Sequence, residues 1–365
     1  MKTKAIVTRN QGEFSMEEVT IHEPKEEEVL IRIKAVGVCH TDLSVKNGSI
    51  PCPMPIVLGH EGAGVVEQVG AAVQGIEPGD HVLLSYSTCG KCDACLQGKP
   101  YGCSSFVMFN FGGVMPDGTR RIEKEGEEIS SFFGQSSFSE YSVTNYRNLV
   151  KVPKDVPLET LAPLSCGIST GSGAVINKLK PEPGSSIAVF GCGAVGLSAV
   201  MAAKLKGCTT IIAIDINDNR LELAKELGAT HSINSTEVEN VIGKIHELSN
   251  GGVNYSVETS GLPLVLRQAV DSTKALGTTA VVGAPPVGTT VELDHFGIIL
   301  EKTITGVIMG SGVPQIFIPQ LIELYKQGLF PYDKLIKTYD FSQIEQAAAD
   351  SKSGIAIKPV MRVSE

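Results

Sequence analysis

The pattern of hydrophobic and polar positions differs between the two halves of the chain. In the first 150 residues, short runs rich in β-branched residues are separated by glycine and proline, as at 29–36, 62–69 and 81–84. Short apolar runs with frequent turn signals are typical of antiparallel strands. The first half therefore predicts an irregular antiparallel β-barrel.

From about residue 183 the pattern changes, because longer apolar runs now alternate with amphipathic stretches. The apolar runs are 186–190, 210–214, 253–258 and 278–282, and the amphipathic stretches include 194–206, 219–227 and 313–327. Nearly continuous buried strands that alternate with helices predict a doubly wound parallel sheet of the α/β class. This domain is expected to be inserted in the second half, and the tail is a candidate to rejoin the first domain.

Length and composition narrow the class of protein. A chain of 365 residues suggests about two domains, and no run approaches the roughly 20 apolar residues that cross a bilayer. The net charge of −9 and the lack of a basic run count against nucleic-acid binding. Nine cysteines without an apolar export signal indicate a reducing compartment, so a soluble cytoplasmic protein is expected.

Four cysteines lie within fifteen residues, at Cys89, Cys92, Cys95 and Cys103. Four thiolates at such spacings can close on one tetrahedral ion and leave no position for water or substrate, which is typical of structural zinc. Two disulfides are the first alternative, and the missing export signal counts against them. A zinc ribbon that grips nucleic acid is the second, but it normally separates two cysteine pairs by about 15–20 residues.

A glycine-rich turn follows the apolar run 186–190 and opens the next amphipathic stretch. It reads Gly191-Cys-Gly193-Ala194-Val195-Gly196, and in this context it matches the dinucleotide-binding fingerprint. The three glycines would give the tight turn, the close approach of the pyrophosphate and close packing of the helix, whose N–H groups would hold the diphosphate. A packing turn without a ligand is the alternative.

Asp215 lies 19 residues past the last glycine of the turn, at the end of the next apolar run. Its carboxylate would bind the ribose hydroxyls of the adenosine half and would repel a 2′-phosphate, which favours NAD over NADP. Arg220 follows one helical turn later and would tolerate that phosphate or pack on the ribose, so it weakens the preference.

A sparser set of metal-binding residue types is spread over the first half. Cys39 stands in Gly-Val-Cys-His-Thr-Asp, His60 and Glu61 in Gly-His-Glu-Gly-Ala-Gly, and Cys166 in Leu-Ser-Cys-Gly. Two thiolates and one imidazole leave a fourth zinc position open, as catalytic zinc requires. Each residue alone also fits an ordinary core or surface position, and the spacings do not prove a site.

The segment Gly59-His60-Glu61, with Gly64, Gly70 and Val73 at fixed distances, resembles the signature of the zinc-containing medium-chain alcohol dehydrogenases. Gly-Val-Cys-His-Thr-Asp-Leu, Leu-Ser-Tyr and Pro-Leu-Ser-Cys-Gly-Ile are most similar to the bacterial aryl-alcohol (benzyl-alcohol) type. The resemblance implies a GroES-like catalytic domain at 1–167 and 309–365. It also implies a Rossmann coenzyme domain at 168–308.

The resemblance implies a role for each residue of the sparse set. Cys39, His60 and Cys166 would hold a zinc ion that acts as a Lewis acid on the alcohol. Asp42 would orient His60 through its second ring nitrogen, and Glu61 would lie behind the ion as a transient ligand. Thr41 would pass the alcohol proton to the nicotinamide ribose.

The resemblance also implies contacts to coenzyme and substrate. For the coenzyme, His40 and, with less support, Lys358 would reach the pyrophosphate, Thr170 the nicotinamide, and Val282 and Ala284 would line the site. Two positions depart from many relatives: Ser44 replaces the histidine that ends the proton relay, and Ser85 replaces a bulky aromatic and suggests a wider pocket. The remaining pocket candidates are Phe132, Phe133 and Ile308, and the two phenylalanines fit a plain core equally well.

The function expected from the resemblance is NAD-dependent oxidation of a primary aromatic or allylic alcohol, such as benzyl alcohol or geraniol, to its aldehyde. Two zinc ions per chain and a homodimer or homotetramer are implied as well. The alternatives are glutathione-dependent formaldehyde oxidation, oxidation of short aliphatic alcohols, or a non-catalytic relative with a structural role. The last would be expected to lose the open-site ligands, which are all present.

Overall fold

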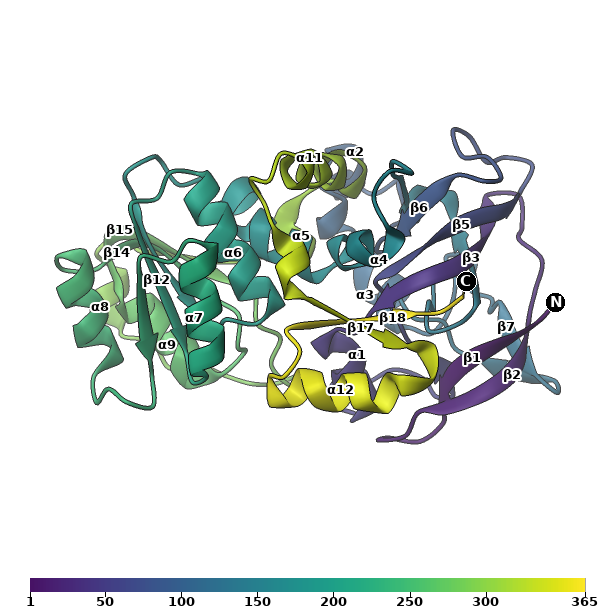
Figure 1. Cartoon of the computed structure of the whole chain (residues 1–365), viewed down its shortest axis with the longest axis horizontal. Helices are drawn as coiled ribbons and strands as arrows, with labels where there is room; N and C mark the ends of the chain where they lie inside the picture. Colours follow the sequence, from purple (N-terminus) through teal and green to yellow (C-terminus); the bar gives the residue numbers. More distant parts are fainter. Residues whose placement is uncertain (365) are drawn as a thin grey trace. The chain divides into compact units, whose positions relative to one another are not determined.

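The computed structural model describes residues 1–364, which form two compact units (Figure 1). The first unit contains Met1–Cys166, Val313–Glu323 and the chain from Asp333 onward. The second unit contains Gly167–Gly312 and Leu324–Tyr332. The chain thus enters the second unit after Cys166, passes through the first unit at Val313–Glu323 and the second at Leu324–Tyr332, and returns to the first unit at Asp333.

The second unit is built on a six-stranded sheet in which every neighbouring pair is parallel. The order is β13-β12-β11-β14-β15-β16. The strands are β11 (Ser186–Phe190), β12 (Thr210–Asp215), β13 (His231–Asn234), β14 (Val253–Glu258), β15 (Thr273–Val281) and β16 (Thr303–Gly306). In chain order this is 3-2-1-4-5-6, the arrangement of a doubly wound dinucleotide-binding fold. The predicted parallel α/β domain is confirmed.

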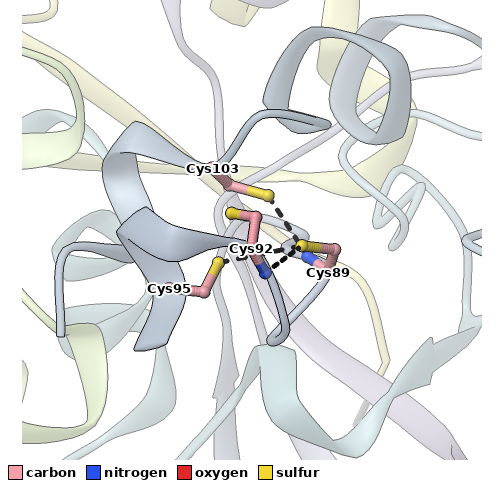
Figure 2. A group of neighbouring side chains, drawn as sticks. All are labelled: Cys89, Cys92, Cys95 and Cys103. Atoms are coloured by element: carbon pink, nitrogen blue, oxygen red, sulfur yellow. Dashed lines mark hydrogen bonds between the residues drawn. The ribbon is translucent and has the colours of Figure 1, made fainter. Parts of the chain in front are cut away.

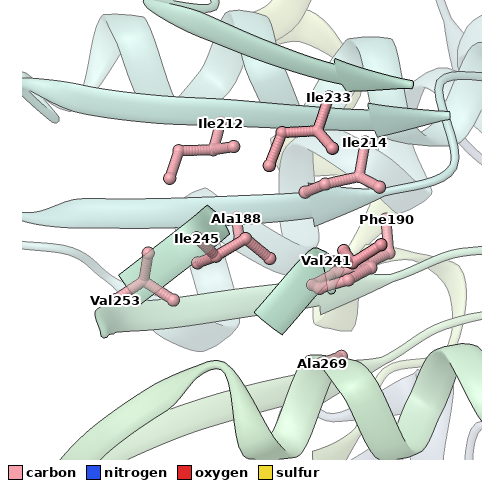
Figure 3. Close-up of a cluster of buried hydrophobic side chains, with 9 residues drawn as sticks. All are labelled: Ala188, Phe190, Ile212, Ile214, Ile233, Val241, Ile245, Val253 and Ala269. Atoms are coloured by element: carbon pink, nitrogen blue, oxygen red, sulfur yellow. The ribbon is translucent and has the colours of Figure 1, made fainter. Parts of the chain in front are cut away.

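Apolar side chains on one face of this sheet form a continuous core with two helices. Ala188 and Phe190 of β11 lie beside Ile212 and Ile214 of β12, and all four are at most 3% exposed (Figure 3). Helices α8 (Val241–Ser249) and α9 (Pro263–Asp271) cover this face. Helices α6 (Ala194–Leu205) and α7 (Asp218–Leu227) pack together on the other side (Figure 1).

Strand β15 begins five residues before the predicted run 278–282. Lys274, Ala275 and Leu276 are exposed, and Leu276 has a left-handed φ of 65°. The pairing with β14 changes register in this stretch. Because this part of the strand buries little apolar surface, the hydrophobic pattern did not reveal it.

The first unit contains two largely antiparallel sheets. The larger has the order β10-β6-β5-β3-β18-β17, with β9 also paired to β3, and the smaller has the order β4-β1-β2-β7-β8. The predicted runs 29–36, 62–69 and 81–84 correspond to β3 (Glu28–Gly37), β5 (Gly62–Val69) and β6 (His81–Leu84). The remaining strands are β1 (Lys2–Thr8), β2 (Ser15–Ile21), β4 (Ile56–Val57), β7 (Ile122–Lys124), β8 (Glu127–Ile129), β9 (Tyr141–Asn145), β10 (Leu149–Lys151), β17 (Ile336–Asp340) and β18 (Lys358–Arg362).

The C-terminal tail completes the larger sheet of the first unit, because β18 pairs antiparallel with β3 and parallel with β17. No helix in residues 1–364 is long and apolar enough to cross a membrane. The remaining helices are α1 (His40–Lys46), α2 (Asp93–Leu96), α3 (Phe106–Phe111), α4 (Leu158–Leu161), α5 (Gly167–Gly173), α10 (His295–Ile298), α11 (Pro314–Lys326) and α12 (Ile344–Ser353).

A buried ion pair joins β3 to the loop before β7. The Arg121 guanidinium donates from Nε to Glu28 Oε2 at 2.8 Å and from Nη2 to Glu28 Oε1 at 2.5 Å. The two side chains are only 4% and 8% exposed. Two parallel hydrogen bonds between charged groups hold both side chains in a fixed geometry.

We expect Arg121→Ala to lower the free energy of unfolding by about 3–5 kcal/mol, because the Glu28 carboxylate would stay buried without its cation and keep only the N–H of Lys25 as a donor. Arg120 is the matched control, since its ion pair with Glu128 lies at the surface, and Arg120→Ala should cost less than about 1 kcal/mol. Denaturant unfolding measures both variants. Equal losses would contradict the role given to the buried pair.

Candidate metal and coenzyme sites

The four closely spaced cysteines converge on one point (Figure 2). Their Sγ atoms all lie within 4.8 Å of one another, and Cys89 Sγ is 4.0 Å from Cys95 Sγ. A tetrahedral zinc with Zn–S bonds of about 2.3 Å places its sulfurs roughly 3.8 Å apart. The cluster therefore has the size of a four-thiolate zinc site, and none of these cysteines forms a disulfide.

Backbone N–H groups point at these sulfurs and favour their ionised form. The N–H of Cys89 donates to Cys103 Sγ and that of Cys92 to Cys89 Sγ, each at 3.3 Å. The N–H groups of Cys95 and Ser104 lower the pKa of Cys92 to about 5. Burial and hydrogen bonds to Cys92 and Cys103 raise the pKa of Cys95 to about 12. Because the cluster cannot carry four negative charges alone, a dication such as zinc fits it.

A buried amide closes the base of this cysteine lobe. Asn110 Oδ1 accepts from the N–H of Ser87 at 2.8 Å, and Asn110 Nδ2 donates to the carbonyls of Ser87 and Phe106. Ser87 precedes the first cysteine, and Phe106 follows the last. The two ends of the lobe are therefore tied to each other independently of the sulfurs.

The sparse set also converges, although its members are far apart in sequence. Cys39 precedes α1, His60 lies between β4 and β5, and Cys166 follows a short 3₁₀ helix at Ala162–Ser165. One donor atom from each of Cys39, His60, Glu61 and Cys166 lies within 4.8 Å of the others. All four belong to the first unit.

Asp42 joins two of these residues. Its Oδ1 lies 2.9 Å from His60 Nδ1, and its Oδ2 accepts from the backbone N–H of Cys39 at 3.0 Å. Oδ1 also accepts from the N–H of Gly59 at 3.0 Å. The carboxylate is fully buried. It fixes the ring of His60 so that Nε2 faces the cysteines.

The donor atoms of this site suit a zinc ion. His60 Nε2 is buried and has no hydrogen-bond partner among residues 1–364. Burial alone would lower the pKa of His60, but the charges of Asp42 and Cys39 outweigh it and raise the pKa. A hydrogen bond from Cys166, followed by the charges of Lys358 and His60, lowers the pKa of Cys39. An unpartnered imidazole nitrogen beside two sulfurs is the donor set of catalytic zinc.

Glu61 and Lys358 form a buried ion pair behind this site. Lys358 Nζ lies 2.9 Å from both carboxylate oxygens of Glu61, and the two side chains are 3% and 0% exposed. Burial alone would lower the pKa of Lys358, but the Glu61 carboxylate outweighs it and raises the pKa. The ammonium that the sequence suggested for the pyrophosphate is thus engaged by Glu61. The pyrophosphate contact that the sequence suggested for Lys358 stays a prediction.

The remaining first-unit candidates differ in how far they are exposed. His40 is exposed, and Thr41 is half-buried with its Oγ1 3.9 Å from Cys39 Sγ. Ser44 and Ser85 are buried, at 6% and 1% exposure. The N–H of Ser85 donates to the carbonyl of Asn148, so this residue is part of the barrel framework.

Phe132 and Phe133 pack on His60. Phe133 stacks on the imidazole with ring centroids 4.6 Å apart, and Phe132 meets it edge-on at 5.5 Å. Phe132 is fully buried and Phe133 is 4% exposed. Both side chains are therefore core residues that support the His60 ring. This is the second of the two roles that the sequence allowed for them.

In the second unit, the glycine-rich turn has the geometry that its sequence predicts. Gly191 has a φ of 89°, and a Cβ on Gly196 would lie 1.8 Å from the Gly191 carbonyl oxygen. A Cβ on Gly193 would meet nothing within 4 Å. The first and third glycines are therefore required by the turn itself, whereas the space at Gly193 is open for a ligand. Ala194 and Val195 follow in the first turn of α6.

Asp215 ends β12 beside this turn. Its Oδ2 accepts from the N–H of Cys192 at 2.6 Å, and its Oδ1 accepts from Ile216 and Asn217. Arg220 Nη1 lies 3.8 Å from Oδ2. The carboxylate thus supports the glycine turn and also lies where the ribose of a dinucleotide would bind.

The other second-unit candidates lie at the ends of its elements. Thr170 is half-buried in α5, and Val282 is half-buried, with its N–H donating to the carbonyl of Glu258. Ala284 is exposed, and Ile308 is 47% exposed. Val282 and Ala284 follow β15 and Ile308 follows β16, so all three lie at the carboxyl edge of the sheet, where doubly wound folds bind ligands.

A dinucleotide-binding sheet and an open metal position in one chain define the class of zinc-dependent dehydrogenases, which exchange hydride with a nicotinamide coenzyme. Comparison with known families supports this class. Residues 25–154 match the model described as "Alcohol dehydrogenase GroES-like domain", and residues 194–327 match the one described as "Zinc-binding dehydrogenase".

Relatives with known names extend this result. The chain is 44% identical to a geraniol dehydrogenase of Castellaniella defragrans, over 98% of this chain and 96% of the relative. It is 47% identical to a benzyl alcohol dehydrogenase from Acinetobacter calcoaceticus, with a TM-score of 0.96 and full coverage of both chains. An alcohol dehydrogenase zinc-binding domain protein from Burkholderia ambifaria is 51% identical, with a TM-score of 0.97 and full coverage of both chains.

The chain belongs to the zinc-containing medium-chain alcohol dehydrogenases and resembles their aryl-alcohol type. The predicted family and fold are confirmed. The cofactors of this enzyme are zinc and a nicotinamide coenzyme, and its substrates are small molecules.

Proposed function

We propose that this enzyme oxidises primary aromatic or allylic alcohols, such as benzyl alcohol and geraniol, to aldehydes with NAD. The observation that carries the proposal is the meeting of Cys39, Cys166 and an unpartnered His60 Nε2 in one buried cluster. The printed activities of the geraniol and benzyl alcohol dehydrogenase relatives support the substrate class.

In this proposal the first unit is the catalytic domain and the second is the coenzyme domain. Cys39, His60 and Cys166 hold the catalytic zinc, and Cys89, Cys92, Cys95 and Cys103 hold a structural zinc. When bound, the catalytic zinc supplies Lewis-acid activation of the alcohol and the coenzyme supplies the hydride acceptor.

The protein's own residues prepare the catalytic site. Asp42 keeps the proton on His60 Nδ1, so that Nε2 is free to bind metal. Lys358 holds both oxygens of Glu61 and so restrains it from the metal position. Thr41 Oγ1, 3.9 Å from Cys39 Sγ, relays the alcohol proton: it receives that proton as its own hydroxyl proton moves on. Because Ser44 is buried and cannot act as a base near neutral pH, we assign the exit of that proton to exposed His40 or to water.

For the coenzyme, we propose that Gly193, Ala194 and Val195 approach the pyrophosphate and that Asp215 binds the adenosine ribose. The open space at Gly193 supports the first assignment. The buried carboxylate beside the turn supports NAD, because a 2′-phosphate would meet a like charge at Asp215. Arg220 is only 3.8 Å from that carboxylate and reduces the discrimination.

Asp215→Gly should shift the coenzyme preference toward NADP. The variant removes the repelling charge, so the ratio of kcat/KM for NAD to that for NADP should fall by roughly 10-fold or more, which corresponds to about 1.4 kcal/mol. Thermal unfolding must accompany the kinetics, because three backbone N–H groups lose their acceptor. A higher kcat/KM with NADP in the unmodified enzyme would contradict the assignment.

The substrate proposal is tested by kcat/KM with NAD for benzyl alcohol, geraniol, ethanol and S-hydroxymethylglutathione. We expect the first two to exceed ethanol by at least 100-fold. The highest value with S-hydroxymethylglutathione or ethanol would support one of the alternative activities. Absence of turnover with all four, in protein that contains two zinc ions, would favour a non-catalytic role.

We also propose that the enzyme is a cytoplasmic homo-oligomer. Strand β16 is one of the two edge strands of the parallel sheet, and exposed apolar side chains lie in it and in neighbouring segments: Leu276, Phe296, Ile299 and Ile304 are 71%, 70%, 61% and 36% exposed. An exposed edge with apolar neighbours is a common pairing surface. Light scattering should therefore give a dimer or tetramer, and Ile304→Lys with Phe296→Lys should give monomers. A monomeric unmodified enzyme would contradict this proposal.

A further inference from the structure

A loop without cysteine, histidine or acidic residues packs against the backbone around His60. This 132–137 loop lies between β8 and β9 and runs beside Gly59–Gly62. The N–H of Ser137 donates to the carbonyl of Gly59 at 3.0 Å. Phe133 stacks on the imidazole, as described above. The loop therefore contacts both the backbone and the ring of His60.

Gln135 is the polar centre of this loop. Its Nε2 lies 3.1 Å from the carbonyl oxygen of His60 and 3.1 Å from those of Leu84 and Ser85. Its Oε1 accepts from the N–H of Gly62 at 3.2 Å. The side chain is 2% exposed. One buried amide thus holds the backbone on the C-terminal side of His60, at its carbonyl and at the N–H of Gly62, and ties it to the end of β6.

The glycines on both sides of His60 and Glu61 are explained by the close approach of Ser137 and Phe138. A Cβ on Gly59 would lie 2.4 Å from the backbone nitrogen of Phe138, and a Cβ on Gly62 would lie 2.7 Å from Ser137 Cβ. Neither distance is sterically possible without backbone movement. Glycine is therefore required at both positions, because the end of the loop at Ser137 and Phe138 packs directly against them.

The loop itself holds a backbone conformation that its sequence does not favour. Phe133 has a φ of 53° and Ser136 a φ of 51°, both in the left-handed region that costs non-glycine residues about 1–3 kcal/mol. Hydrogen bonds oppose this cost: the N–H groups of Gln135 and Ser136 donate to the Phe132 carbonyl, and Ser136 Oγ accepts from Phe132 N–H. Because this strained backbone conformation lies directly against His60, we infer that the conformation of the loop determines the position of that histidine.

We propose that Gln135 is a positioning residue for His60. It fixes the backbone on the C-terminal side of the histidine, while Asp42 fixes the ring and accepts from the N–H of Gly59 on the other side, so that Nε2 is presented to the metal without rearrangement. The inference rests on the proposed function, in which His60 is a ligand of the catalytic zinc. Groups that orient a metal ligand from outside the coordination sphere typically contribute roughly 10–100-fold to metal affinity.

The test replaces Gln135 by Met, which keeps the length of the side chain and removes its hydrogen bonds. In the full-length enzyme with two zinc ions, zinc should leave the Cys39–His60–Cys166 site roughly 10–100-fold faster in the presence of a chelator. Zinc in the cysteine lobe should leave at the unmodified rate. With cobalt(II) in the Cys39–His60–Cys166 site, the visible absorption of the variant should shift, because the spectrum reports ligand geometry.

Asn148→Leu is the matched control. Asn148 is 1% exposed, and its Nδ2 donates to Ser87 Oγ and Thr144 Oγ1, but its side chain makes no hydrogen bond with residues 59–62. It should lose a similar amount of stability and keep the unmodified cobalt spectrum and zinc release. Zinc release and spectra in Gln135→Met equal to those of this control would overturn the proposal.

Ser137→Ala keeps the proposal testable if Gln135→Met does not fold. It removes only the hydrogen bond from Ser137 Oγ to Gln135 Oε1, so we expect a smaller increase in zinc release of about 2–5-fold. An unchanged release rate would contradict the inference. The proposed function fails separately: unmodified enzyme that binds zinc in the cysteine lobe alone would show that His60 is not a ligand.

Discussion

Replacing Cys166 by Ser is expected to abolish alcohol oxidation while leaving the fold intact. A serine hydroxyl is not ionised near neutral pH and is a poor zinc ligand, so the site keeps only one thiolate and one imidazole. The loss of kcat/KM should exceed the roughly 100-fold effect of removing an outer partner of a ligand. Metal analysis should find one zinc per chain in place of two, and circular dichroism should be unchanged.

Cys52→Ser is the control for this substitution. Cys52 is half-buried like Cys166 but belongs to neither cysteine cluster, and burial raises its pKa to about 12. The control should keep two zinc ions and full turnover. If Cys166→Ser also kept both, the catalytic zinc would have to lie elsewhere, and the assignment of Cys39 and His60 would fail with it.

Both the cysteine lobe and the parallel sheet could be predicted from the sequence because each is specified locally. The lobe ligands lie within fifteen residues, so spacing alone indicates that they can meet. Strands β11 and β12 are buried almost throughout, so each appears as a nearly uninterrupted apolar run. Strand β13 reads His-Ser-Ile-Asn and is mostly half-buried, and it was not predicted. Where a strand is exposed, as at Lys274–Leu276 in β15, the same signal failed.

The open metal site could not be derived in this way, because its contacts span most of the chain. Cys39 and Cys166 come together through the barrel, and only the resemblance to a family suggested that they meet. Lys358 and Glu61 are 297 residues apart, and no motif links them, so their ion pair could not be predicted. The tail brings Lys358 to this position because β18 pairs with β3.

Gln135 was not identified from the sequence at all. A single glutamine in a loop carries no motif, and its function depends on three carbonyl oxygens from two other segments. The signal that could have found it is indirect. Gly59 and Gly62 flank His60, and paired glycines around a candidate ligand indicate that another backbone approaches closely there.

The second large effect is expected from Cys103→Ser in the cysteine lobe. Cys103 is 5% exposed, and its sulfur accepts the N–H of Cys89, so its loss opens the cluster and removes one thiolate. The structural zinc should be lost and the residues between Cys89 and Cys103 should unfold. The cost should be several kcal/mol, below the roughly 10–16 kcal/mol that zinc supplies to isolated fingers, because the barrel has its own core.

Limited proteolysis tests this expectation directly, because an unfolded lobe should be cleaved between 89 and 103 while the rest of the chain resists. The Asn110 amide holds both ends of the lobe, so the barrel and the zinc at His60 should survive. Cys208→Ser is the control, since Cys208 is 8% exposed and lies outside both clusters. Simultaneous loss of both zinc ions from Cys103→Ser would show instead that the lobe and the catalytic site depend on one folding unit.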